Sequence, residues 1–90
     1  MKILLDDEIT PEAIRNAPIY SVFVCDWFGV CTMMLVEPGR WARPTTNQIF
    51  EFGMGYFRCD ASRTEQIIGM MQREENDGGL QPIALFLEEQ

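Results

Sequence analysis

The stretch Ile19–Pro38, IYSVFVCDWFGVCTMMLVEP, is the apolar centre of this chain and decides its fold. One break at Asp26–Gly29 divides it into two arms rich in Val, Phe, Tyr, Thr and Cys. Side chains of these types suit a pleated, buried surface better than a helix. The stretch is therefore predicted to form two buried strands joined by a turn. If the turn is centred on Phe28, Cys25 is expected directly opposite Cys31.

A membrane span and a buried helix are the two alternatives for this stretch. A span needs about 20 apolar residues with few charges. Asp26 lies in the middle, however, and no cluster of Lys or Arg flanks either end. For a short apolar run, periodicity alone does not distinguish a strand from a buried helix. The β-branched residues and the Asp-x-x-Gly break favour strands.

The N-terminal part predicts a strand over Lys2–Leu5, followed by a short helix. Thr10 and Pro11 have the types preferred at the N-cap and first helical position, and Pro18 sets the latest end of this helix. Beyond the hairpin, Arg40–Pro44 is predicted to be an irregular loop.

The C-terminal half predicts two further strands around a helix. The alternation over Gln48–Arg58 is the cleanest in the chain, and the expected core-facing side chains are Phe50, Phe52, Met54 and Tyr56. Ser62 and Glu65 have capping-box spacing, and the helix that they begin is expected to end at Asn76–Gly79. Ile83–Leu87 is the last predicted strand.

Together these elements predict one domain over residues 1–90 with an α+β fold. The expected architecture is a two-layer sandwich, in which two helices pack on one face of an about five-stranded, mostly antiparallel sheet. Because so small a domain has a large surface for its volume, some apolar area is expected to remain exposed. A homodimer through the edge of the final strand is therefore predicted.

The net charge of −7 is unevenly distributed. Residues 1–37 carry −4, residues 38–63 carry +2 and residues 64–90 carry −5. Non-specific nucleic-acid binding requires several Lys or Arg residues to displace counterions from phosphates, so it is not expected. An acidic surface keeps a protein in solution and suits a basic protein partner.

Catalytic and metal-binding patterns are missing from the sequence. The chain contains no histidine, which is the commonest general base and an imidazole metal ligand. The cysteines Cys25, Cys31 and Cys59 do not have the close spacing of a structural zinc site. No enzyme activity, metal or cofactor is therefore expected. The odd cysteine count and the absence of a signal-peptide pattern predict reduced thiols in the cytoplasm.

The predicted partner-binding residues are Arg40, Trp41, Arg43, Glu74, Glu75 and Asp77. Trp and Arg are over-represented among residues that dominate binding energy, and the three acids supply charge for a basic partner. The alternative for Trp41 is a structural side chain that closes the core, with the arginines paired to nearby acids.

The resulting functional hypothesis is a small, non-enzymatic protein-binding domain that acts as an inhibitor or adaptor. Its size and acidity are shared by small inhibitors, including phage-encoded proteins that block host defence nucleases, which is a likeness of composition alone. Two alternatives remain open: a ligand-binding domain or enzyme with a cavity beside the Gly53 and Gly55 strand face, and a structural subunit of an assembly.

Overall fold

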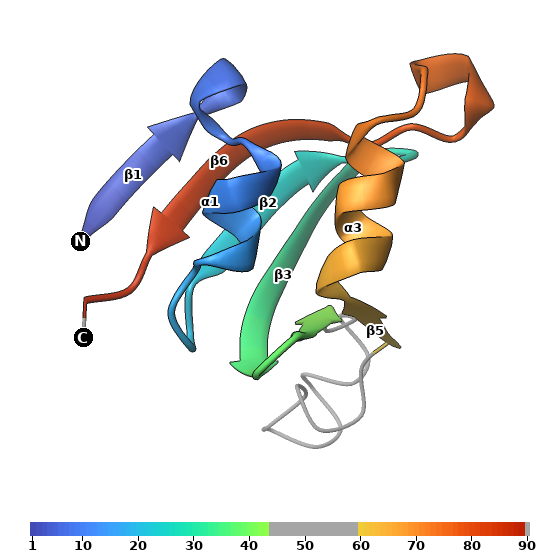
Figure 1. Ribbon diagram of the computed structural model, residues 1–90. Helices are drawn as coiled ribbons and strands as arrows, with labels where there is room; N and C mark the ends of the chain where they lie inside the picture. The colour runs from blue at the N-terminus through green and yellow to red at the C-terminus, as the bar shows by residue number, and fades with distance from the viewer. Residues whose placement is uncertain (44–59, 90) are drawn as a thin grey trace.

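The computed structural model describes residues 1–43 and 60–89, which form an open antiparallel sheet with two α-helices on one face (Figure 1). The order of the six strands is β1-β6-β2-β3-β4-β5. Their bounds are Lys2–Leu5 (β1), Val22–Asp26 (β2), Val30–Glu37 (β3), Arg40–Arg43 (β4), Asp60–Arg63 (β5) and Gln81–Leu87 (β6). The helices are α1 (Pro11–Arg15) and α3 (Thr64–Met71), with short 3-10 turns η1 (Asp6–Glu8) and η3 (Glu75–Asp77).

The predicted α+β class is confirmed, but the described sheet has six strands where about five were expected. The two additional strands, β4 and β5, pair with each other and extend the hairpin on one side. The predicted strand Gln48–Arg58 and its face of Phe50, Phe52, Met54 and Tyr56 lie outside the described residues. So do Gly53 and Gly55, beside which a cavity was predicted.

The central hairpin has the register predicted from the sequence. Cys25 lies opposite Cys31 and Val24 opposite Thr32. Alternation along β2 and β3 then turns Phe23 and Met33 towards the helices, where both are buried. The turn at Asp26–Gly29 and the apolar pattern of the two arms fix this register. A slip of one residue would turn Phe23 and Met33 to the opposite face of the sheet.

The core lies between the sheet and the two helices. Its largest fully buried side chains are Trp41, Phe23, Ile14, Ile67, Leu80 and Leu85. The rings of Phe23 and Trp41 meet edge to face, with centroids 6.2 Å apart and an interplanar angle of 68°. This arrangement is favourable for two aromatic quadrupoles and joins β2 to β4 across β3.

Helix α1 begins as predicted, whereas α3 differs at both ends. The hydroxyl of Thr10 accepts the backbone N–H of Ala13 at 3.2 Å, and Pro11 is the first helical residue.

The predicted capping box of α3 at Ser62 and Glu65 is wrong by one residue. Arg63 is the N-cap, and its N–H donates to Oε1 of Gln66 at 2.7 Å. The hydroxyl of Thr64, the first residue of the helix, accepts the indole N–H of Trp41.

The end of α3 and the position of the last strand also correct the sequence-based predictions. Helix α3 ends at Met71, and η3 carries the chain on to Gly78 and Gly79. Strand β6 lies between β1 and β2, so both of its edges are already paired. The predicted dimer through the edge of Ile83–Leu87 is therefore wrong, because that edge is not available for pairing.

The structure confirms the prediction of strands for Ile19–Pro38, because β2 and β3 lie within this stretch. Within residues 1–43 and 60–89, no helix has the length and apolar character needed to cross a bilayer.

Candidate interaction surface at the β2–β3 turn

The turn between β2 and β3 is built from three residues, Trp27, Phe28 and Gly29, between the paired residues Asp26 and Val30. Oδ1 of Asp26 accepts the N–H of Gly29 at 3.1 Å, and the N–H of Trp27 donates to the carbonyl of Gly29 at 2.8 Å. These bonds explain why the Asp-x-x-Gly sequence closes a tight turn, since Asp side chains commonly bond to backbone groups a few residues further on.

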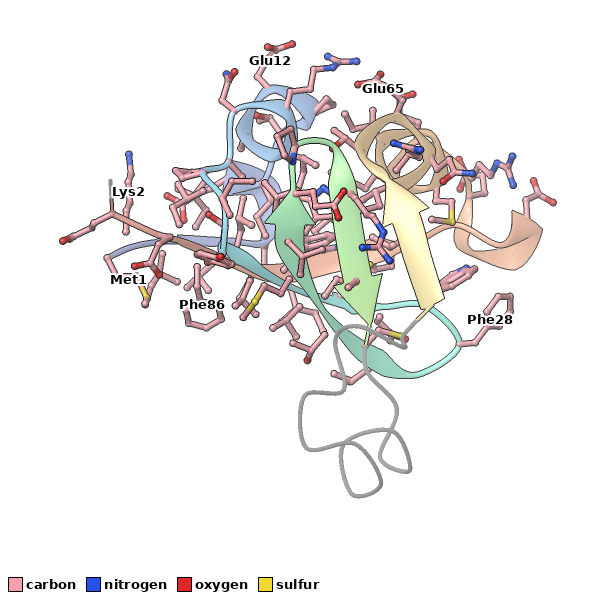
Figure 2. The ribbon with its side chains drawn as sticks, turned by 90° about the horizontal axis from the view of Figure 1, so that it is seen from below. Met1, Lys2, Glu12, Phe28, Glu65 and Phe86 are labelled. Carbon is pink, nitrogen blue, oxygen red and sulfur yellow. The ribbon has the colours of Figure 1, made fainter. Side chains whose placement is uncertain are left out.

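Phe28 is the most exposed large hydrophobic residue in the described part of the chain. It is 87% exposed, and its backbone lies in the left-handed region with φ of 56°. Figure 2 shows it at the end of the molecule opposite Met1 and Lys2, projecting away from the body. A left-handed backbone is unfavourable for a bulky side chain, and an exposed ring contributes no burial. Stability alone therefore does not account for phenylalanine at this position.

Two neighbouring side chains widen the apolar surface around Phe28. The Trp27 ring lies 5.8 Å from the Phe28 ring at 50°, and Trp27 is half-buried against the core. Val30 begins β3 and is 72% exposed. Cys31 Sγ lies 3.6 Å from the carbonyls of Trp27 and Gly29. The turn is therefore anchored by Trp27, which packs against the core, and by Val30 and Cys31, which belong to β3.

An acidic segment lies at the same end of the sheet as this turn. Asp26 pairs with Gln81 at the start of β6, directly after the segment that contains Glu74 and Asp77 (Figure 1). Asp26, Glu74 and Asp77 are all exposed. We call Asp26–Val30 together with Glu74 and Asp77 the turn surface. It combines an apolar projection with negative charge.

The structure separates the six partner-binding residues predicted from the sequence. Arg40–Arg43 is strand β4 and not a loop, and Trp41 is fully buried. This placement supports the alternative in which Trp41 closes the core. The prediction of an exposed binding residue at Trp41 is wrong, because its ring is buried. The end of β3 next to Arg40 is about 23 Å from the β2–β3 turn, at about 3.3 Å per residue.

The remaining predicted residues have different surroundings. Arg40 is half-buried and its Nη1 lies 3.5 Å from Oε1 of Glu37. Arg43 lies in β4 opposite Asp60. Glu74 and Asp77 belong to the turn surface, and Glu75 begins η3 between them. The acidic and basic halves of the predicted set are therefore not one site.

The sequence analysis did not identify Phe28 as a binding residue, although a signal was present. An aromatic pair at the tip of a two-stranded hairpin, beside a glycine, has little neighbouring chain to cover it. The prediction for Trp27-Phe28-Gly29 is a strand break and assigns the tripeptide no binding role. The tertiary structure adds the 87% exposure and the left-handed backbone.

A cluster of charged side chains that links the two helices has a structural role. Arg15 of α1 makes a bidentate pair with Glu65 of α3, with both N···O distances 2.9 Å, and a further contact of 3.0 Å with Glu12. The hydrogen bond from Arg15 lowers the pKa of Glu65, and the same pair raises the pKa of Arg15. The pair joins the two helices over the core.

An open hollow of about 420 Å³ lies where η1, the end of α3 and the start of β6 meet. Its walls include the acids Asp6 and Asp7 and the amides Gln72 and Gln81. Asp6 and Asp7 are exposed, so the hollow does not hold desolvated carboxylates. In the described ranges, no three His, Cys, Asp or Glu side chains are grouped as metal ligands.

Comparisons with known proteins do not assign this chain to a class. No protein-family model matches the sequence, and neither a curated protein nor a solved structure matches it significantly. The turn surface and the fold are therefore the features of this chain that bear on its function.

Proposed function

We propose that this chain is a non-enzymatic protein-binding domain that inserts Phe28 into an apolar pocket with a basic rim on its partner. The observation that carries this proposal is the combination of 87% exposure and a left-handed backbone at Phe28. Residues held in unfavourable backbone conformations cluster at functional sites, where the surrounding structure maintains them. Exposed aromatic side chains next to other apolar groups are typical of interaction surfaces.

The charge distribution supports the choice of a basic partner. The turn surface carries the exposed acid Asp26 at the base of its apolar tip, and the exposed acids Glu74 and Asp77 lie in the segment that leads to Gln81, the partner of Asp26. Opposite charge around an apolar contact steers encounter and excludes acidic competitors. A domain of this kind would act as an inhibitor if its partner's pocket is a functional site, and as an adaptor if the pocket is a docking site.

Tyr20 provides a matched control for Phe28. It is also an exposed aromatic residue with a left-handed backbone, 60% exposed with φ of 74°. Like that of Phe28, its backbone conformation is held by hydrogen bonds of the hairpin, because its N–H donates to the carbonyl of Leu35 at 2.7 Å and continues the pairing of β2 with β3. Tyr20 precedes β2 and so lies at the other end of the hairpin.

The proposal is tested by affinity capture from a lysate of the organism that encodes the chain. Wild type, Phe28→Gly and Tyr20→Gly are immobilised at equal density, and glycine suits the left-handed backbone at both positions. We expect one basic protein to be retained by wild type and Tyr20→Gly and to be lost with Phe28→Gly. Equal retention by all three would show that the turn is not the binding site.

A photo-crosslinking residue at position 28 gives a second readout. The captured protein should crosslink through position 28, and the crosslinked peptide should come from an apolar pocket with Lys or Arg at its rim. A crosslink confined to position 20 would contradict the proposal.

A further inference from the structure

We propose that the outer edge of β1 is a docking site for β1 of a second copy of this chain, paired antiparallel about Leu4. This inference does not depend on the turn surface, which lies at the other end of the molecule (Figure 2). In the part of the chain that the structure describes, β1 has β6 as its single neighbour. An edge strand with unpaired backbone groups is a template for another strand.

The side chains on this edge are apolar and exposed. Ile3 is 50% exposed and Leu5 is 52% exposed. Their cross-strand neighbours are Phe86 and Ala84 of β6, and Figure 2 shows Phe86 on the sheet face turned away from the helices. A second β1 in register would place Ile3 of one copy beside Leu5 of the other. The two apolar rows would then form one continuous strip next to Phe86.

The backbone of β1 is oriented for this pairing. The N–H of Leu5 donates to Oε1 of Glu8 at 3.0 Å rather than to β6, so it points to the outer side of the strand. In an antiparallel ladder, the N–H and C=O of one residue point to the same side, and the side alternates along the strand. Ile3 therefore also points its backbone groups outward. Pairing Ile3 with Leu5 of the second copy would form four inter-strand hydrogen bonds.

The charges along this edge are self-complementary. The segment Lys2–Asp6 reads KILLD, and in a register centred on Leu4 the Lys2 of each copy lies opposite Asp6 of the other. Lys2 is the only lysine of the chain, and it makes no ion pair with a described residue. Because the chain has a net charge of −7, two copies repel at most other surfaces. A two-fold contact at β1 instead pairs each cation with the partner's acidic turn η1.

Glu8 competes with this assembly. Its carboxylate occupies the N–H of Leu5 in the monomer and must release it when the second strand pairs. Within β1 (Lys2–Leu5) this register pairs three residues of each copy, Ile3 to Leu5, with the same three of the other, so the dimer is expected to be weak, with a dissociation constant between about 10 µM and 1 mM. Two six-stranded sheets would join into one sheet of twelve strands, with the helices of both copies on the same face.

The test is sedimentation equilibrium of the full chain from about 20 µM to 1 mM. We expect a concentration-dependent shift from monomer to dimer mass. Ile3→Lys should weaken the dimer at least tenfold, whereas Val30→Lys, a similar change at an exposed β-branched residue of the distant turn, should change it less than twofold. A monomeric mass at 1 mM, or a dimer insensitive to Ile3→Lys, would overturn the proposal. Circular dichroism melts confirm that both variants are folded.

Amide hydrogen exchange and a second pair of variants test the register. Protection of Ile3 and Leu5 should rise with protein concentration, while protection of Leu4, which points to β6, should stay constant. Glu8→Ala should tighten the dimer more than Asp7→Ala, although each removes one negative charge. Equal effects of these two variants, or a rise in protection at Leu4 alone, would overturn the pairing about Leu4.

Discussion

Trp41 donates its indole N–H to the hydroxyl of Thr64 at 3.1 Å, which ties strand β4 to the first residue of helix α3. The ring is fully buried against Phe23. A sheet strand and the helix that covers it are thus joined by one amphipathic side chain. This bond satisfies the polar end of a residue whose apolar body fills the core.

The first prediction concerns the stability that depends on Trp41. Trp41→Ala should reduce the free energy of unfolding by about 3–5 kcal/mol, because it removes a large buried ring and leaves a cavity. Trp41→Phe should cost less, about 1–2 kcal/mol, because an aromatic ring remains while the bond to Thr64 is lost. Urea denaturation followed by far-ultraviolet circular dichroism measures both. Equal stability of wild type and Trp41→Ala would contradict the buried position.

The second prediction uses one substitution at two glycines. A Cβ on Gly79 would lie 2.3 Å from the carbonyl oxygen of Arg73 and 2.6 Å from that of Glu74, so Gly79→Ala should destabilise by about 1–3 kcal/mol. A Cβ on Gly69 meets no atom within 4 Å. Because Gly69 lies inside α3, Gly69→Ala should stabilise by about 0.5–1 kcal/mol. Thermal melts of the two variants should therefore shift in opposite directions, and shifts of the same sign would contradict this account.

The third prediction concerns pH and the pair between Arg15 and Glu65. The hydrogen bond from Arg15 lowers the pKa of Glu65 in the folded state. The stabilisation by Glu65 is therefore fully present above its unfolded pKa of about 4.3 and is lost as the pH falls through the lowered folded pKa. The melting-temperature difference between wild type and Glu65→Gln should be largest near neutral pH and should disappear in acid. Glu74→Gln controls for the loss of one charge. A difference that grows towards low pH would contradict the assignment.

The fourth prediction separates binding from folding at Phe28. Phe28→Gly should not lower the free energy of unfolding by more than about 0.5 kcal/mol, because the ring is exposed and glycine accommodates the left-handed backbone. The same variant should weaken the proposed complex by about 2 kcal/mol or more. Calorimetric melting and titration against the captured partner give the two values. Loss of stability with unchanged affinity would end the role of Phe28 as an anchor.

The fifth prediction concerns the charge of the turn surface. Glu74→Lys should slow association with the basic partner about threefold at low salt. Glu37→Lys, the same change of charge at the opposite end of β3, should have a smaller effect. Stopped-flow measurements at rising salt should bring the three rate constants together, because screening removes long-range attraction. Rates independent of salt would contradict a basic partner.

The sequence predicted the hairpin and the start of α1 because those features are local. Apolar arms on both sides of Asp26–Gly29 define one register, and the types of Thr10 and Pro11 define one helix start. The β4 strand was not predicted because four residues next to prolines have little intrinsic strand signal. Its conformation comes from pairing on both sides, with β3 and with β5.

The candidate site was predicted only in part, for a related reason. The acids Glu74 and Asp77 were identified from composition, whereas Trp41 was assigned a binding role that its burial does not support. Trp and Arg look alike in a sequence whether they face solvent or the core. Phe28 is the opposite case: its apolar side chain within an apolar stretch indicates burial, and its position at the tip of the hairpin beside Gly29 is the one sign of exposure in the sequence.

Local chemistry in the sequence thus determined the two central strands, their register, the first helix and the acidic surface, because each depends on residues close together in the chain. Only the tertiary structure decided which edges remain open and which aromatic side chains reach solvent. Strand order placed β6 inside the sheet and β1 at its edge, and packing buried Trp41 while leaving Phe28 exposed. These outcomes depend on contacts between distant segments, whose pairing is chosen by the burial of the whole core rather than by any one stretch.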